Sequence, residues 1–230
     1  MAAMAGYFSP DLFRFLRELR AHNDREWFTA NKARYEREGR DPLLRFIVDL
    51  GPELARFAKH FVADPRPVGG SMMRIYRDTR FAKDKSPYKT ALMAHFQHAR
   101  GEEGATPGFY LRLEPGHSAV GAGIWRPEPG ALKKIRKRIA DDSKGWQRVT
   151  SGKTMGLSCG MAGESLKRPP PGFDPEHPCI EDIKRKDFAI TVELDDKRIA
   201  SPAFKGDVVK AYKAITPFVE FVTRAIGLPF

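Results

Sequence analysis

The chain has 230 residues, of which 41% are hydrophobic and 11% are aromatic. A disordered chain would lack the apolar surface needed to offset the entropy lost on ordering, so this composition excludes a largely disordered protein. The 40 Lys and Arg residues outnumber the 29 Asp and Glu residues and give a formal net charge of +11. Such a charge attracts polyanions, which keeps an anionic small molecule or nucleic acid among the expected partners, but it does not define a fold.

The cysteines and the N-terminus predict a compartment. Cys159 and Cys179 are too few for a disulfide framework and lack a paired metal-binding spacing, so we expect free thiols in a reducing environment. The first residues, MAAMAGYFSPDLF, contain no basic segment followed by an apolar run, and no apolar stretch approaches the ~20 residues that span a bilayer. The sequence therefore predicts a cytoplasmic protein without a membrane partner.

Two helix-start signals open the chain. Ser9 is a capping residue, and Pro10 after it favours the first helical position, ahead of a helical apolar stripe at 12–19. A second helix is predicted to start at Asn23, because Glu26 three residues later completes a capping-box pattern.

Glycine and proline are expected to divide the helical region that follows. Gly39 and Pro42 should interrupt the second helix before the helical period resumes at Leu43. The Gly51–Pro52 pair should kink or restart the helix after that. The first sixty residues therefore read as helical hairpins.

Strand-like patterns follow the turn-forming residues 63–70. Four successive stretches alternate in the manner of strands, and a fifth appears later in the chain. A hairpin is expected across Pro115–Gly116. The five stretches are MMRIY (72–76), ALMAHFQHA (91–99), GFYLRL (108–113), SAVGAGIW (118–125) and DFAITVEL (187–194).

The rest of the chain alternates between helical periods and loops. A basic helix is predicted around 132–139, loops at 151–163 and 166–178, and a final helix from Ser201, which Pro217 should bend. We predict one α+β domain over 1–230, in which a mainly antiparallel sheet is packed by the N-terminal helices and a C-terminal helix.

Charge is concentrated in RIYRDTRFAKDKSPYK, residues 74–89, which hold six cations, two carboxylates and two tyrosines. Arg grips two anion oxygens with a planar fork, whereas Lys is a mobile point charge, so the mixture suits an anionic ligand. We expect Asp78 to orient an arginine and Tyr88 to shape one wall. Tyr76 and Tyr88 are expected either to stack on a base or to donate a hydroxyl. The predicted site residues are Arg74, Arg77, Asp78, Arg80, Lys85, Tyr88 and Lys89.

The same stretch fits the pattern R-x-x-R-D-x-R-F-x-x-x-K-x-x-Y-K at every fixed position. It resembles the signature of a bacterial family of uncharacterised proteins, domain of unknown function 2461. NDREWF (23–28) and LKRPPPGFDPEHP (166–178) are also similar to features of that family, so the resemblance covers nearly the whole chain. Membership implies no activity, cofactor or catalytic residue.

Three functions remain open from the residues alone. The first is a binding module for a phosphate-bearing small molecule or a nucleic-acid end. The second is a hydrolase or transferase acting on a phosphorylated or nucleic-acid substrate, with Asp78 or Asp174 as proton acceptor. The third is an ion-pair network that braces a helix against the sheet. The excess of cations over carboxylates favours a ligand, because unpaired buried cations are costly.

Other candidate sites are weaker. His95 and His98 would point to opposite sides of a strand, so we predict no metal site there. His177 and Asp174 are expected to make turn and capping hydrogen bonds. The basic segment 132–153 either follows a phosphate backbone or forms a solvated face. No P-loop, nucleophile elbow or zinc-protease motif is present, and neither a cofactor nor an oligomeric state follows from the sequence.

Overall fold

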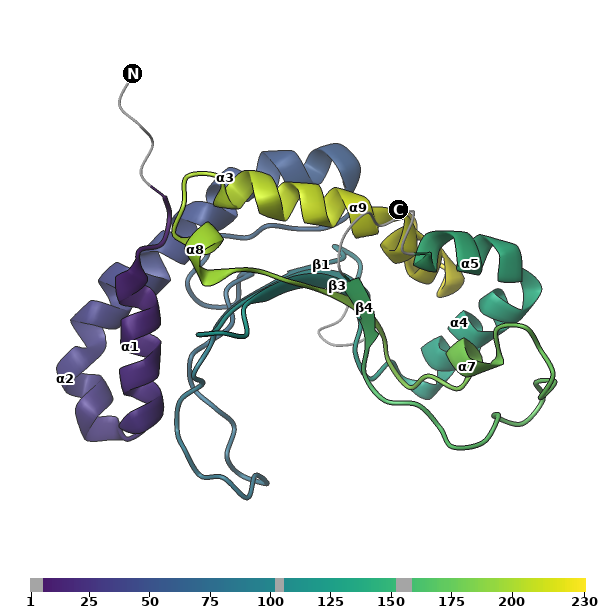
Figure 1. The fold of residues 1–230 in the computed structure, drawn as a ribbon, viewed down its shortest axis with the longest axis horizontal. Helices are drawn as coiled ribbons and strands as arrows, with labels where there is room; N and C mark the ends of the chain where they lie inside the picture. Colours follow the sequence, from purple (N-terminus) through teal and green to yellow (C-terminus); the bar gives the residue numbers. More distant parts are fainter. Residues whose placement is uncertain (1–5, 102–105, 152–158) are drawn as a thin grey trace.

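The computed structural model describes residues 6–101, 106–151 and 159–230. The fold is α+β, as predicted, and within these ranges five antiparallel strands form one sheet in the order β1-β2-β3-β5-β4 (Figure 1). The strands are β1 (Leu92–Gln97), β2 (Gly108–Leu113), β3 (Ala119–Ile124), β4 (Cys159–Ala162) and β5 (Phe188–Glu193). The helices are α1 (Pro10–Ala21), α2 (Arg25–Tyr35), the π-helical η1 (Glu36–Arg40), α3 (Asp41–Phe57), α4 (Pro129–Asp141), α5 (Ser143–Thr150), α7 (Ile180–Ile183), α8 (Asp196–Ile199) and α9 (Phe204–Ala225).

The main core lies between the sheet and the helices α3 and α9, which run across one of its faces (Figure 1). Strand β1 shows the alternation that this arrangement requires, since Leu92, Ala94 and Phe96 are buried and the residues between them are only half-buried. Phenylalanine dominates the packing, and burying one such side chain contributes about 1.5–3 kcal/mol. The fully buried phenylalanines are Phe15, Phe46, Phe96, Phe109, Phe188, Phe204 and Phe218.

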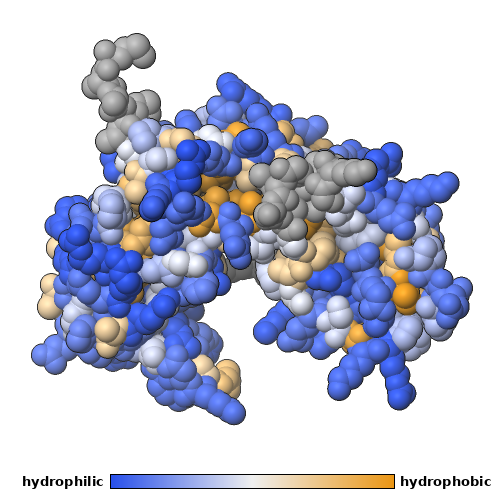
Figure 2. Space-filling model, in the orientation of Figure 1, coloured by the Kyte–Doolittle hydropathy of each residue, from blue (hydrophilic) through white to orange (hydrophobic). Residues whose placement is uncertain are grey.

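The other face of the sheet is concave. Helices α1 and α2 stand at one end of it and α4 and α7 at the other, so the molecule is arched (Figure 1). Figure 2 shows the hollow between these two lobes, with mostly hydrophilic residues along its rims. The site described below lies on this side of the sheet, beside β1.

The two predicted helix starts have different outcomes. Ser9 caps α1 as predicted, and its Oγ accepts a hydrogen bond from the Asp11 N–H at 3.2 Å. The second prediction is wrong by one residue, because Asp24 caps α2 by accepting the Trp27 N–H at 2.8 Å. The side chain of Asn23 is engaged instead by the backbone of Tyr88, 65 residues further along the chain.

The predicted helix breaks are absent. Residues 36–40 form a π-helical turn that leads directly from α2 into α3, and an Arg40–Glu36 ion pair of 2.7 Å spans it. The wider π turn accommodates Pro42, which lacks a backbone donor. The restart predicted at Gly51–Pro52 is also wrong. Helix α3 continues to Phe57, since buried leucines before and after the proline hold it against the core.

Two strand assignments need correction. The stretch 72–76 is not a strand, because only isolated bridges join Met72 to Ala94 and Tyr76 to Tyr88. Conversely, β4 lies inside the segment 151–163 that was predicted as a loop, and it pairs with β5 through Met161 and Ile190. Its residues, CGMA, carry no alternation that would reveal a strand. Residues 152–158 of the predicted loop lie outside the described ranges.

The remaining elements follow the sequence more closely. The hairpin between β2 and β3 forms as predicted, with Gly116 at a φ of 73° in its turn. Helix α9 begins at Phe204, after the predicted Ser201, and continues through Pro217. Arg136 of the basic helix α4 is buried, so that helix is not uniformly solvated. Among the described residues, no helix is long and apolar enough to cross a membrane.

Candidate functional site

The charged stretch, residues 74–89, forms a loop that leaves the sheet region and returns to it, and we call it the charged loop. Two backbone hydrogen bonds close its base, from the Arg77 N–H to Pro87 O at 2.8 Å and from the Lys89 N–H to Ile75 O at 2.7 Å. The loop projects below the sheet on its concave side (Figure 1). Its base is therefore fixed to the body of the protein while its tip reaches into solvent.

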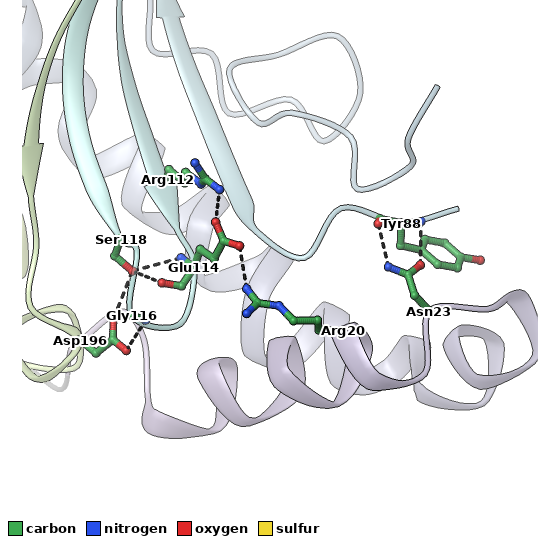
Figure 3. A network of polar contacts seen from close by, with 8 residues as sticks. All are labelled: Arg20, Asn23, Tyr88, Arg112, Glu114, Gly116, Ser118 and Asp196. Atoms are coloured by element: carbon green, nitrogen blue, oxygen red, sulfur yellow. Dashed lines mark hydrogen bonds and ion pairs between the residues drawn. The ribbon is translucent and has the colours of Figure 1, made fainter. Parts of the chain in front are cut away.

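The base of the loop is held by the connection between α1 and α2. The Asn23 side chain donates to Tyr88 O at 3.0 Å and accepts the Tyr88 N–H at 3.0 Å (Figure 3). The Tyr88 ring stacks on Phe28 with centroids 4.1 Å apart, and burial raises the pKa of its hydroxyl. Tyr88 is thus a core residue that anchors the loop, which corrects the expectation that its ring forms a pocket wall.

A neighbouring network joins α1 to the turn between β2 and β3. The Glu114 carboxylate is buried and pairs with Arg20 at 2.7 Å and also with Arg112 (Figure 3). Ser118 Oγ accepts the Glu114 N–H and donates to Glu114 O, and it lies 3.3 Å from an Asp196 carboxylate oxygen. These contacts place α1, and with it Asn23, at a fixed position relative to the sheet.

Both carboxylates of the charged loop pair with arginines of the same loop. Asp78 accepts hydrogen bonds from the Arg80 side chain, the shortest at 2.7 and 3.0 Å, and a further one from the Arg80 backbone N–H. Those from the side chain are the main reason why the pKa of Asp78 is lowered to about 2. Asp84 pairs with Arg77, and its pKa is lowered first by hydrogen bonds from Ser86 and then by Arg77. The loop tip is therefore bridged by its own charges.

The two lysines of the predicted site also bind backbone oxygens of the loop. Lys85 Nζ donates to Thr79 O at 2.9 Å, and Lys89 Nζ donates to Arg74 O at 2.7 Å. None of the predicted cations is buried. The argument that buried cations require an external anion is therefore wrong for this loop, and a ligand has to be argued from the cleft beside it.

An open cleft of about 850 Å³ lies between the charged loop, the segment 62–73 and β1. Of the predicted site residues, Arg74, Asp78 and Lys89 line it, whereas Arg77, Arg80, Lys85 and Tyr88 do not. The full lining is Val62, Asp64, Pro67, Val68, Gly69, Gly70, Ser71, Met72, Met73, Arg74, Tyr76, Asp78, Lys89, His95, Gln97, His98, Ala99 and Gly101.

Two lining residues of β1 were not predicted as part of the site. His95 and Gln97 lie on the half-buried face of the strand, and the Gln97 amide nitrogen is 3.1 Å from His95 Nδ1. The alternation of β1 indicates that these side chains share a face. The bridge between Met72 and Ala94 places the start of the charged loop beside β1, and no local pattern predicts that bridge.

The loop 166–178 does not join this cleft. It lies at the opposite end of the arch, beside α4 and α7 (Figure 1). The His177 ring lies 3.2 Å from Ser143 Oγ through Nε2, and its Nδ1 accepts the Cys179 N–H at 3.1 Å. The backbone N–H of His177 donates to Asp174 O. These are the predicted turn and capping contacts. The described residues contain no group of three or more side chains arranged to hold a metal ion.

The geometry defines an α+β protein with an open antiparallel sheet and a charged loop beside a surface cleft. A comparison with family models matches residues 11–221 to the conserved hypothetical protein family DUF2461, and the chain belongs to that family. The comparisons with curated proteins and with solved structures gave no match.

Proposed function

We propose that the protein binds a phosphate-bearing, anionic ligand in the cleft beside the charged loop. The observation that carries this proposal is the position of Arg74. Its side chain is exposed on the cleft lining, and no ion pair or side-chain hydrogen bond joins its guanidinium to a described residue. Because guanidinium groups bind two phosphate oxygens at once, Arg74 is the natural first contact for the ligand.

The electrostatics of the lining support an anion. Its carboxylates, Asp64 and Asp78, are each paired with an arginine two residues later, Arg66 and Arg80. Their negative charges are therefore compensated, and Arg74 gives this part of the lining a positive character. A volume of about 850 Å³ lies within the ~300–1,000 Å³ of ordinary ligand sites.

The same features favour binding over the alternative of a hydrolase or transferase. A carboxylate with a pKa of about 2 is a poor proton acceptor near neutral pH, which argues against Asp78 as a general base. Asp174, the other proposed acceptor, lies in the loop at the far end of the arch. The purely structural alternative is disfavoured because exposed ion pairs such as Arg80–Asp78 contribute little to stability.

A thermal-shift experiment tests the proposal with inorganic phosphate and nucleotides as probes. Ligand that binds the folded state raises Tm in a saturable manner. We expect this increase in the wild type and its loss in Arg74→Ala. Arg56→Ala is the control, since it removes the same charge from an exposed pair on α3 and should keep the increase. Equal responses of the two variants, or no response of the wild type to any phosphate compound, would contradict the proposal.

A further inference from the structure

Phe81 lies at the tip of the charged loop and is 95% exposed. The Arg80 guanidinium lies over the Phe81 ring, 5.9 Å from its centre. In Figure 2, hydrophobic atoms lie at the end of this projection among hydrophilic ones. The phenyl ring does not pack in the core, so its presence is not explained by the stability of the fold.

Tyr76 presents a second aromatic surface, at the cleft. Its ring is 5.4 Å from that of Tyr88, which itself stacks on the buried Phe28. Tyr76 is 52% exposed, so one part of the ring is fixed by the aromatic core and the rest faces solvent. A ring held in this way can stack on a planar ligand without first losing rotational freedom.

The charge around these rings is positive. The charged loop carries six cations against two carboxylates, and both carboxylates are already paired with Arg77 and Arg80. Aromatic rings interleaved with cations are the features with which proteins bind unpaired nucleic-acid strands, because every base offers a ring face and every nucleotide a phosphate.

We propose that the ligand of this site is single-stranded nucleic acid. Bases stack on Tyr76 and Phe81, while Arg74 and Lys89 contact the phosphates. The inference rests on the function proposed above and specifies its ligand. A duplex is disfavoured because its bases are already stacked on each other. An anionic membrane is disfavoured because stable anchoring requires two membrane-binding signals, and one exposed ring among cations supplies too little buried apolar area.

The test measures the fluorescence anisotropy of a short labelled oligonucleotide, single-stranded or annealed, with the full chain. Phe81 is almost entirely exposed, so its substitution should leave the fold intact. We expect Phe81→Leu, which keeps an apolar side chain without an aromatic face, to weaken single-strand binding by roughly five- to one-hundred-fold. Phe81→Tyr should restore it. Val48→Ala removes exposed apolar surface from α3 and should have no effect.

Three results would overturn the inference. The first is wild-type affinity of Phe81→Leu for the single strand. The second is equal or tighter binding of the duplex. The third is binding to phosphatidylserine-containing vesicles that depends on Phe81, without binding to the oligonucleotide. If inorganic phosphate still raises Tm through Arg74 in any of these cases, the cleft remains an anion site and only the nucleic-acid assignment fails. If phosphate also has no effect, both proposals fail.

Discussion

Asp78 is an exposed carboxylate with an unusually low pKa of about 2, which results chiefly from its hydrogen bonds with Arg80. Since the pKa of an unperturbed Asp is about 4, the Arg80–Asp78 pair stabilises the loop above about pH 4, and this contribution is lost as pH falls through about 2. We expect an NMR titration of the Asp78 carboxyl carbon to have its midpoint near pH 2. The midpoint should rise toward pH 4 in Arg80→Ala. A wild-type midpoint near pH 4 would show that the pair does not form in solution.

Gly121 of β3 is a second residue with a specific consequence. A Cβ atom at this position would overlap the Tyr110 hydroxyl and the Ile190 carbonyl oxygen. We expect Gly121→Ala to lower the free energy of unfolding by about 1–3 kcal/mol in urea denaturation. Gly206→Ala is the matched control, because the same added methyl group meets open space in α9 and should stabilise the helix by up to about 1 kcal/mol. Equal effects of the two substitutions would contradict the packing described here.

Residue chemistry explains which of the smaller predictions failed. Asn23 and Asp24 are both good capping residues, so the local pattern does not distinguish them. Asp24 caps α2 because the Asn23 side chain is hydrogen-bonded to the backbone of Tyr88, which is distant in the sequence. The capping position could therefore be predicted only to within one residue.

The joint between the charged loop and the α1–α2 connection depends on Asn23. Asn23→Ala removes both of its hydrogen bonds to Tyr88, whose N–H and C=O are then left unpaired next to the core. We expect a loss of about 1–3 kcal/mol in the free energy of unfolding, measured by urea denaturation. Asn31→Ala is the control. The Asn31 side chain donates to Trp27 O and accepts from Arg34, both in its own helix, so its loss should matter less. A change of only a few tenths of a kcal/mol in Asn23→Ala would show that the joint is not structural.

Secondary-structure elements were predicted best where periodicity is strong. The alternation of β1, the strand-like sequences of β2 and β5, and the apolar stripe of α1 identify these elements directly. Proline and glycine predict helix breaks within 36–57 that do not form, since packing on both sides of Pro52 keeps the helix continuous. The short strand β4 was missed because its place in the sheet is determined by pairing with β5 and not by its own residues.

The candidate site could be predicted only in part. The charged loop is one continuous stretch of sequence, so its concentration of charge can be recognised from the sequence alone. The cleft is also lined by His95 and Gln97, which lie there because β1 is the edge strand beside the charged loop. The sequence therefore locates the charged loop, but the chain fold decides which of its residues line the cleft.

The whole molecule carries a net charge of +11, and the basic helix α4 is an alternative surface for nucleic acid. It lies at the opposite end of the arch from the charged loop (Figure 1). We expect the double substitution Lys133→Ala and Lys134→Ala to leave oligonucleotide affinity nearly unchanged, while log K falls linearly with log salt concentration in both proteins. Anisotropy titrations at several salt concentrations check this. A larger loss from the α4 substitutions than from Arg74→Ala would move the binding surface to α4.

The strand order also has a consequence for the newly made chain. Strand β5 pairs with both β3 and β4, so in the described sheet β4 can join only with β5 or after it. Until β5 emerges from the ribosome, β3 is an open edge whose residues, AVGAGI, carry no charge or proline to discourage pairing with another chain. A pause in translation between β3 and β5 would therefore prolong the exposure of an edge that can pair with another chain.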